Sequence, residues 1–293
     1  MNLDRKLRGY WDARMKDEGA ALGISDCRPF LENKLVNDIF YEGLFKGTPC
    51  IVKCSSRAPE SITNEYEISQ RLSAADPGVC AEALAHWTAK DGRSAFVVTR
   101  KLPGPSLTDL FIKGLDEEES IGVMDDLLRI AAALQKSGIV WRDIISDNLL
   151  MDADGHLRLI DGQFAFLRDD YHEDPYLMRH WRYRMLLFAH HPMMAGHGWN
   201  DVGMLLFLTL KLAKSFLVDE RREQLRGMVA ASAFPVKYGK SDIWRMRITL
   251  LWLKLCRMVP HGSRKDETLR TRIARAQAFI SRDSGRWNDY LYR

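Results

Sequence analysis

The chain has 293 residues, of which 46% are hydrophobic and 28% charged, and its formal net charge is +4. These values are typical of folded globular proteins and exclude disordered and collagen-like chains. The five cysteines (Cys27, Cys50, Cys54, Cys80 and Cys256) are odd in number and have neither disulfide-framework nor zinc-binding spacing. We therefore expect a reduced, cytoplasmic protein, and the charged amino terminus predicts no signal peptide.

The first hundred residues alternate between one short helix and β-rich runs. Residues 4–20 favour a short polar helix. From Lys34 the chain carries short apolar runs around residues 35–36, 39–41, 44–45 and 50–52, and the turn 46–49 predicts a hairpin. A helix is expected over 62–73 and a strand over 95–99. Pro103-Gly104-Pro105 then predicts a loop and a boundary between two lobes.

Beyond this loop the pattern becomes mainly helical. Apolar residues at helical spacing from Ile121 to Leu134 predict an amphipathic helix that ends at Gly138. Residues 149–151 and 157–160 flank an Asp-Ala-Asp-Gly turn and predict a second hairpin. The apolar run 204–218 is interrupted by Lys211 and Lys214, so it predicts a buried helix and no membrane span. We expect an α+β fold with a small β-rich lobe over 1–102 and a larger helical lobe over 103–293.

Three polar residues around the second hairpin form the candidate site for chemistry. Asp143 precedes the hairpin, and Asn148 lies five residues beyond Asp143. Asp161 comes directly after the hairpin, eighteen residues beyond Asp143. Phosphoryl transfer requires a carboxylate that orients the attacking hydroxyl, and an Asn and a second carboxylate supply the oxygen ligands that Mg²⁺ prefers. The spacing therefore predicts a phosphoryl-transfer site.

The same residues resemble the protein-kinase-like superfamily, which implies a bilobal fold with a nucleotide between the lobes. Trp141-Arg142-Asp143 with Asn148 resembles the catalytic loop, and Asp161-Gly162-Gln163 resembles a variant of the metal-binding Asp-Phe-Gly motif. Ile51-Val52-Lys53 resembles the strand whose lysine binds ATP phosphates, and Glu65, favoured over Glu67, would pair with that lysine. The resemblance implies adenine binding at Arg100, Lys101 and Leu102 and Mg²⁺ binding at Asn148 and Asp161. Asp201 resembles the residue that steadies the catalytic loop, although a helix N-cap is an alternative interpretation.

Several departures from protein kinases concern the substrate. The position of the glycine-rich loop reads Lys34-Leu35-Val36-Asn37-Asp38-Ile39-Phe40. Residue 145 is Ile where protein serine/threonine kinases have lysine, and no Ala-Pro-Glu follows Asp161. At these positions the sequence more closely resembles the bacterial lipopolysaccharide core kinases. This resemblance implies a sugar or glycolipid acceptor. Two alternatives stay open: an atypical protein serine/threonine kinase, and a pseudokinase that binds but has lost turnover.

The carboxy-terminal segment is strongly basic. Residues 237–286 contain 13 Lys and Arg against 4 Asp and Glu. Within residues 244–258, Trp and Leu alternate with Arg and Lys at spacings that a helix can separate into two faces. This pattern predicts peripheral contact with the anionic inner face of a membrane, and the alternative is a core helix with solvated cations. No nucleic-acid motif accompanies the charge, so no nucleic-acid partner is expected.

Overall fold

The computed structural model describes residues 3–33, 38–55, 59–90, 92, 94–167 and 200–232. It also describes ten single residues in the carboxy-terminal segment: 247, 248, 250, 251, 254, 255, 257, 270, 273 and 277. The chain divides into two compact units, one of Met1–Asp169 with Lys211–Val218 and one of Asp170–Leu210 with Asp219–Arg293. The predicted lobe boundary at 102/103 stays a prediction.

The first unit begins with a helix and an antiparallel sheet. Helix α1 (Leu3–Arg14) continues as a π-helical turn, η1 (Met15–Gly19). The sheet has the order β1-β2-β3-β5-β4. Its strands are β1 (Ile24–Asn33), β2 (Asp38–Phe45), β3 (Thr48–Ser55), β4 (Ala83–Thr88) and β5 (Ala95–Arg100). Helix α2 (Pro59–Ala75) connects β3 to β4.

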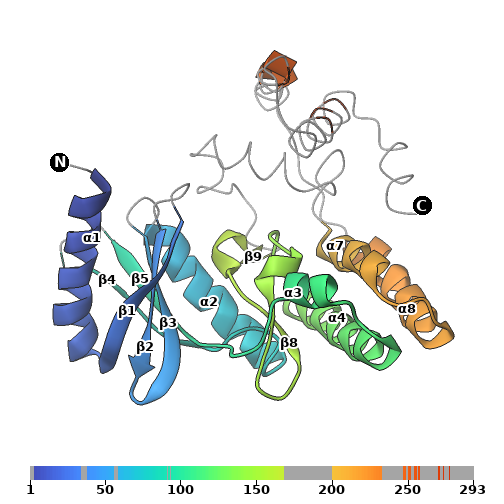
Figure 1. Ribbon diagram of the computed structural model, residues 1–293, viewed down its shortest axis with the longest axis horizontal. Coiled ribbons are helices and arrows are strands. Elements are labelled where there is room, and N and C mark those ends of the chain that lie inside the picture. Colours follow the sequence, from blue (N-terminus) through green and yellow to red (C-terminus); the bar gives the residue numbers. More distant parts are fainter. Residues whose placement is uncertain are drawn as a thin grey trace. The chain divides into compact units, whose positions relative to one another are not determined.

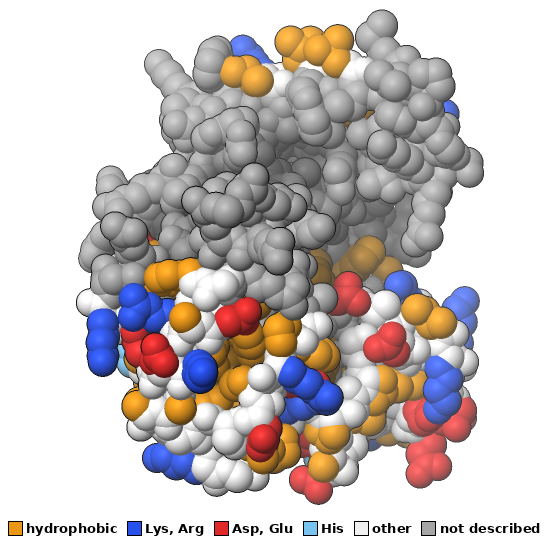
Figure 2. Space-filling model, turned by 60° about the vertical axis from the view of Figure 1, so that its left-hand side comes forward, with side chains coloured by type: hydrophobic (Ala, Val, Ile, Leu, Met, Phe, Trp, Pro, Cys, Tyr) orange, Lys and Arg blue, Asp and Glu red, His pale blue; other side chains and the backbone are white. Residues whose placement is uncertain are grey.

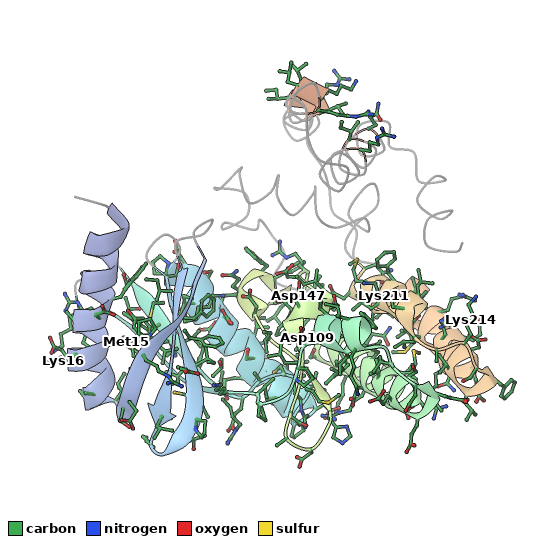
Figure 3. The ribbon with its side chains drawn as sticks, viewed as in Figure 1. Met15, Lys16, Asp109, Asp147, Lys211 and Lys214 are labelled. Carbon is green, nitrogen blue, oxygen red and sulfur yellow. The ribbon has the colours of Figure 1, made fainter. Side chains whose placement is uncertain are left out.

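Two helices cover opposite faces of this sheet (Figure 1). Trp11 and Met15 pack with Tyr41, Cys50, Cys54 and other buried residues on one face, whereas Ile62 of α2 packs with Ala95 and Val97 on the other. In Figure 3, Met15 points toward the sheet and Lys16 points away from it. The expected polar helix therefore contributes two large apolar side chains to the core.

The helical part of the same unit follows β5. It contains α3 (Leu107–Lys113) and α4 (Glu117–Ser137), each of which begins with a capping box. Helix α4 ends at Gly138 in the left-handed conformation, as the sequence predicts. Strand β6 (Ile139–Val140) pairs with β9 (Phe166–Leu167), and the predicted hairpin forms from β7 (Leu149–Met151) and β8 (Leu157–Leu159).

Backbone hydrogen bonds join this hairpin to the segments beside the sheet. Strand β8 exchanges two bonds of 2.9 Å with the segment after α2, where Leu159 N–H donates to Val79 and Ala81 N–H donates to Leu159. Gly104 N–H donates to Met151 in β7 at 3.0 Å. A Cβ on Gly104 would lie 2.6 Å from that same carbonyl oxygen, so a larger residue does not fit this close approach. The α+β fold class is confirmed, with the β-rich part first and the helical part after it.

The second unit contains the beginning of the predicted buried helix. Helix α7 covers only Asp201–Leu208, and a 3-10 turn, η5 (Thr209–Lys211), follows it before α8 (Phe216–Ser232). The expectation of one helix over 204–218 is therefore wrong. Arg222 Nη2 donates to the Thr209 carbonyl at 3.1 Å. This bond gives a partner to one of the carbonyl groups that have no intrahelical hydrogen bond at the end of the helix.

The cap of α7 also differs from the expected one. Asn200 is the N-cap, and its side chain accepts from Gly203 N–H at 2.9 Å. Asp201 is the first helical residue and is buried. Among the described residues, no helix has the length and apolar character needed to cross a bilayer.

Candidate functional site

The register of the sheet directs Lys53 toward α2. Side chains alternate along β3, so Cys50, Val52 and Cys54 pack on the α1 face and Lys53 lies on the other face. Lys53 is opposite Val97 of β5, which packs against Ile62 of α2. Glu65 follows Ile62 by three residues and therefore lies on the same buried stripe of α2. Register alone thus brings the lysine and the glutamate together.

Lys53 bonds two carboxylates. Its Nζ lies 3.0 Å from Glu65 Oε2 and 2.6 Å from Asp161 Oδ1, and it lies 5.8 Å from the ring centroid of Phe40. The side chains of Lys53 and Glu65 are 4% and 6% exposed, whereas that of Asp161 is 28% exposed. The buried pair holds the ammonium in place, and the more open carboxylate faces solvent. Glu67, which the register disfavoured, is exposed.

A tight loop fixes Asp143 to Asn148. Trp141 and Ile144 on either side of Asp143 are buried, and the 3-10 turn η2 (Ser146–Asn148) closes the loop. Asn148 Nδ2 donates to both Asp143 Oδ2 and the Asp143 carbonyl, each at 3.0 Å. The Asn148 carbonyl in turn accepts from Ile160 N–H at 3.0 Å, one residue before Asp161. These bonds connect Asp143 through Asn148 to the Ile160–Asp161 backbone, and the Asp161 side chain continues the connection to Lys53.

Two residues of the site have unusual backbone conformations. Arg142 and Asp161 have φ of 73° and 65°, which are uncommon for residues other than glycine. Arg142 is buried, and its guanidinium lies 4.3 Å from the centroid of the Phe166 ring in β9. Strained backbone of this kind persists where the surroundings hold it, and it occurs frequently at functional sites.

The three predicted hinge residues differ in how their amides are used. Arg100 N–H donates to Glu82 at 2.8 Å and Lys101 N–H donates to Pro49 at 2.9 Å, so both are already bonded. The Leu102 amide donates to no acceptor within the described part of the chain. Lys101 Nζ bonds Glu42 Oε2 at 2.6 Å, and this bond is the main cause that lowers the pKa of Glu42. Leu102 is therefore the hinge residue with a donor available to a ligand.

Two contacts of the site were not predicted from the sequence. Asn64 Nδ2 donates to the carbonyls of Ala165 at 2.7 Å and Gln163 at 3.4 Å, which ties α2 to η3 (Gly162–Phe164) and the residue after it. A Cβ on Gly162 would lie 2.9 Å from Cη2 of Trp141, so the glycine leaves room for the indole ring. The position of Asn64 beside Glu65 was a signal for the first contact, and no sequence pattern indicated the second.

Some expectations lie outside the described residues. They include residues 34–37 of the segment at the glycine-rich-loop position, whose last three residues (38–40) begin β2. They also include most of the segment between Asp161 and Asp201 (168–199), and Trp244 in the basic stretch. Cys50 and Cys54 share a buried face of β3, and the described residues contain no group of three His, Cys, Asp or Glu suited to hold a metal.

Comparison with known proteins relates the chain to kinases over part of its length. It is 38% identical over 110 residues to an Escherichia coli protein, the O-antigen chain terminator bifunctional methyltransferase/kinase WbdD. The matching region covers 36% of this chain and 15% of that protein. It is 39% identical over 71 residues to the Drosophila melanogaster serine/threonine-protein kinase PAK mbt, covering 24% and 11% respectively. The Drosophila melanogaster kinase Warts is 34% identical over 95 residues, covering 30% and 9%. No family model matches the chain.

Proposed function

We propose that the chain is an ATP-dependent phosphotransferase that phosphorylates a hydroxyl, most specifically on a sugar of lipopolysaccharide or a related glycolipid. The observation that carries this proposal is the position of Lys53 Nζ between Glu65 and Asp161, at 3.0 and 2.6 Å. A buried ammonium that a glutamate holds beside a more exposed carboxylate is suited to bind a polyphosphate next to its metal ion.

The donor set supports Mg²⁺. Asn148 uses its Nδ2 for Asp143, and Asp161 uses Oδ1 for Lys53. Neither Asn148 Oδ1 nor Asp161 Oδ2 accepts a hydrogen bond from a described residue, so two oxygen atoms are available as ligands. Amide and carboxylate oxygens are the hard ligands that Mg²⁺ prefers, and the bound ion would neutralise phosphate charge.

The other residues act by position and charge. Asp143 is the residue that orients the acceptor hydroxyl and accepts its proton, and the two bonds from Asn148 fix its carboxylate and backbone. Lys53 contributes positive charge to the α- and β-phosphates, and Leu102 N–H is suited to bind adenine. Because the transition state of phosphoryl transfer requires little covalent chemistry from the protein, positioning supplies most of the rate enhancement.

Two acceptor classes are supported by different observations. The similarity to WbdD and the Ile at position 145 favour a glycolipid sugar. The similarity to PAK mbt and Warts favours a protein serine or threonine, which is the second candidate.

The test is transfer of label from γ-labelled ATP in the presence of Mg²⁺. Extracted lipopolysaccharide and a mixture of generic protein substrates are offered in parallel to the wild-type chain and to Asp143→Asn. We expect label on the glycolipid, and a loss of at least a hundredfold in Asp143→Asn because the orienting carboxylate is removed.

The matched control is Asp147→Asn, because Asp147 is exposed and lies in the 3-10 turn η2, four residues after Asp143 (Figure 3). This variant is expected to retain full transfer. Label on protein alone would favour the second candidate. Nucleotide binding without transfer to either acceptor and without ATP hydrolysis would identify a pseudokinase and contradict the proposal.

A further inference from the structure

The second compact unit presents an exposed apolar stripe in the basic carboxy-terminal segment. The seven described residues between 247 and 257 are all helical. Three of them are large apolar residues that remain exposed to solvent: Ile248 at 45%, Leu251 at 60% and Leu255 at 53%. Spacings of three and four residues place them along one side of a helix. This exposure argues against the alternative of a core helix, which would bury these side chains.

Positive charge flanks the stripe. Arg247 and Lys254 are exposed and seven residues apart, so they lie on one line beside the apolar residues, and Arg257 is exposed one turn further on. Figure 2 shows hydrophobic and basic side chains together on this part of the surface, at the top of the view. No acidic residue is among the described residues from 247 to 277. The surface thus combines apolar and cationic groups without a described negative charge.

The cationic side of this surface opens into a hollow. Lys254 and Arg257 line it together with Ile273 and Gln277, and its volume is about 530 Å³. This volume is within the range of small-molecule sites. A hollow with two cations and a mixed lining is suited to an anionic headgroup that projects from a surface.

We propose that this face, defined by Arg247, Ile248, Leu251, Lys254 and Leu255, binds the surface of an anionic lipid bilayer. The apolar stripe enters the boundary between headgroups and acyl chains, and Arg247 and Lys254 bind lipid phosphates. An anionic bilayer complements both properties of the face at once, which is the basis for choosing it over a protein partner. The inference is independent of the nucleotide site, so either proposal can fail without the other.

The test is co-sedimentation of the full chain with vesicles of two compositions. One is phosphatidylcholine alone, and the other contains about one third phosphatidylglycerol. We expect binding to the anionic vesicles, weak binding to the neutral ones, and a decrease as salt rises from about 50 to 500 mM because salt screens the attraction. Arg247→Glu with Lys254→Glu is expected to weaken binding at least tenfold, since each surface cation contributes roughly fivefold. The double variant Leu251→Gln with Leu255→Gln is expected to weaken vesicle binding by a similar factor at high and at low salt.

Matched controls come from exposed residues of the first unit. Ile112→Gln removes an apolar side chain that is 80% exposed, and Lys214→Glu reverses an exposed lysine. Both are expected to bind vesicles as the wild type does. Because all substituted side chains are exposed, thermal melting should be unchanged. The proposal would be overturned if the wild type did not bind the anionic vesicles. It would also be overturned if both double variants bound them as tightly as the wild type does. A concentration-dependent dimer that the leucine variants abolish without any lipid would overturn it as well, because the stripe would then pair two copies of the chain.

Discussion

Gly162 and Trp141 are adapted to each other at the centre of the candidate site. The indole Cη2 lies 2.9 Å from the position that a Cβ on residue 162 would occupy. Trp141 is 1% exposed and cannot move aside without disturbing the core. Gly162→Ala is therefore expected to displace the neighbouring Asp161 and reduce phosphoryl transfer at least tenfold.

The same contact predicts a compensating substitution. Trp141→His removes the atoms that would clash, so the double variant should recover transfer relative to Gly162→Ala alone. A double-mutant cycle with ATP turnover as its readout measures this coupling. Additive effects of the two substitutions would show that the contact does not position Asp161.

Lys53 is expected to have a structural role that can be separated from its ligand role. Lys53→Met leaves Glu65 buried without its partner ammonium, which costs roughly 3–5 kcal/mol of unfolding free energy. Adding Glu65→Leu removes the unpaired charge and should restore most of the stability, measured by urea unfolding. ATP binding should stay lost in the double variant, and its return would contradict the role of Lys53 at the phosphates.

Among individual residues, the sequence indicated candidate side chains but few of the contacts between them. The spacing of Asp143, Asn148 and Asp161 was sufficient to select them, because a loop and a hairpin of fixed length leave few arrangements. The bonds from Asn64 to Ala165 and Gln163 span about a hundred residues and depend on how α2 lies against η3. The space above Gly162 likewise depends on packing. The position of Asn64 beside Glu65 was a local signal for the first contact, whereas the second has none.

Helix α1 is expected to contribute strongly to the stability of the sheet that carries Lys53. Trp11 is 1% exposed within the core cluster, and its Nε1 donates to Ser94 Oγ at 3.3 Å. Trp11→Ala should lower the unfolding free energy by roughly 3–5 kcal/mol, as other large-to-small core substitutions do. The control Lys16→Ala changes an exposed residue of the next turn and should stay within about 0.5 kcal/mol. Equal effects of the two in urea unfolding would contradict the packing of α1 on the sheet.

The elements that were missed have weak periodicity. Strand β1 contains Pro29 and polar residues, and two register shifts interrupt its pairing with β2. Strand β4 (Ala83–Thr88) is rich in alanine and has one shift against β5. Both hairpins and α4 were predicted because turn residues or a helical apolar stripe mark them. Tertiary packing, which no local pattern records, determines the missed strands and the break after α7.

Unfolding of the whole molecule should depend on pH in the alkaline range. Burial, followed by the nearby Cys27, raises the pKa of Cys50 from 9.0 to about 11. Below pH 9 the thiol is protonated in the folded and unfolded states alike and has no effect. Between pH 9 and 11 the unfolded thiol ionises while the folded thiol does not, so the folded state loses stability. Urea midpoints should fall over this range in the wild type and fall less in Cys50→Ala. Equal falls of the urea midpoint with pH in the wild type and in Cys50→Ala would show that Cys50 does not cause the alkaline loss of stability.

Asp161 as a metal ligand and Asp143 as a residue of the chemical step are the two central assignments in the whole molecule. Calorimetric titration of Mg·ATP into the wild type, Asp143→Asn and Asp161→Asn tests this directly. Asparagine tolerates the left-handed backbone at residue 161, so the second variant removes charge with little change of conformation. We expect the affinity of Asp143→Asn to stay within about threefold of the wild type, because the orienting carboxylate is not a nucleotide ligand. Asp161→Asn is expected to lose at least tenfold in affinity, and wild-type affinity in that variant would contradict the assignment of the site.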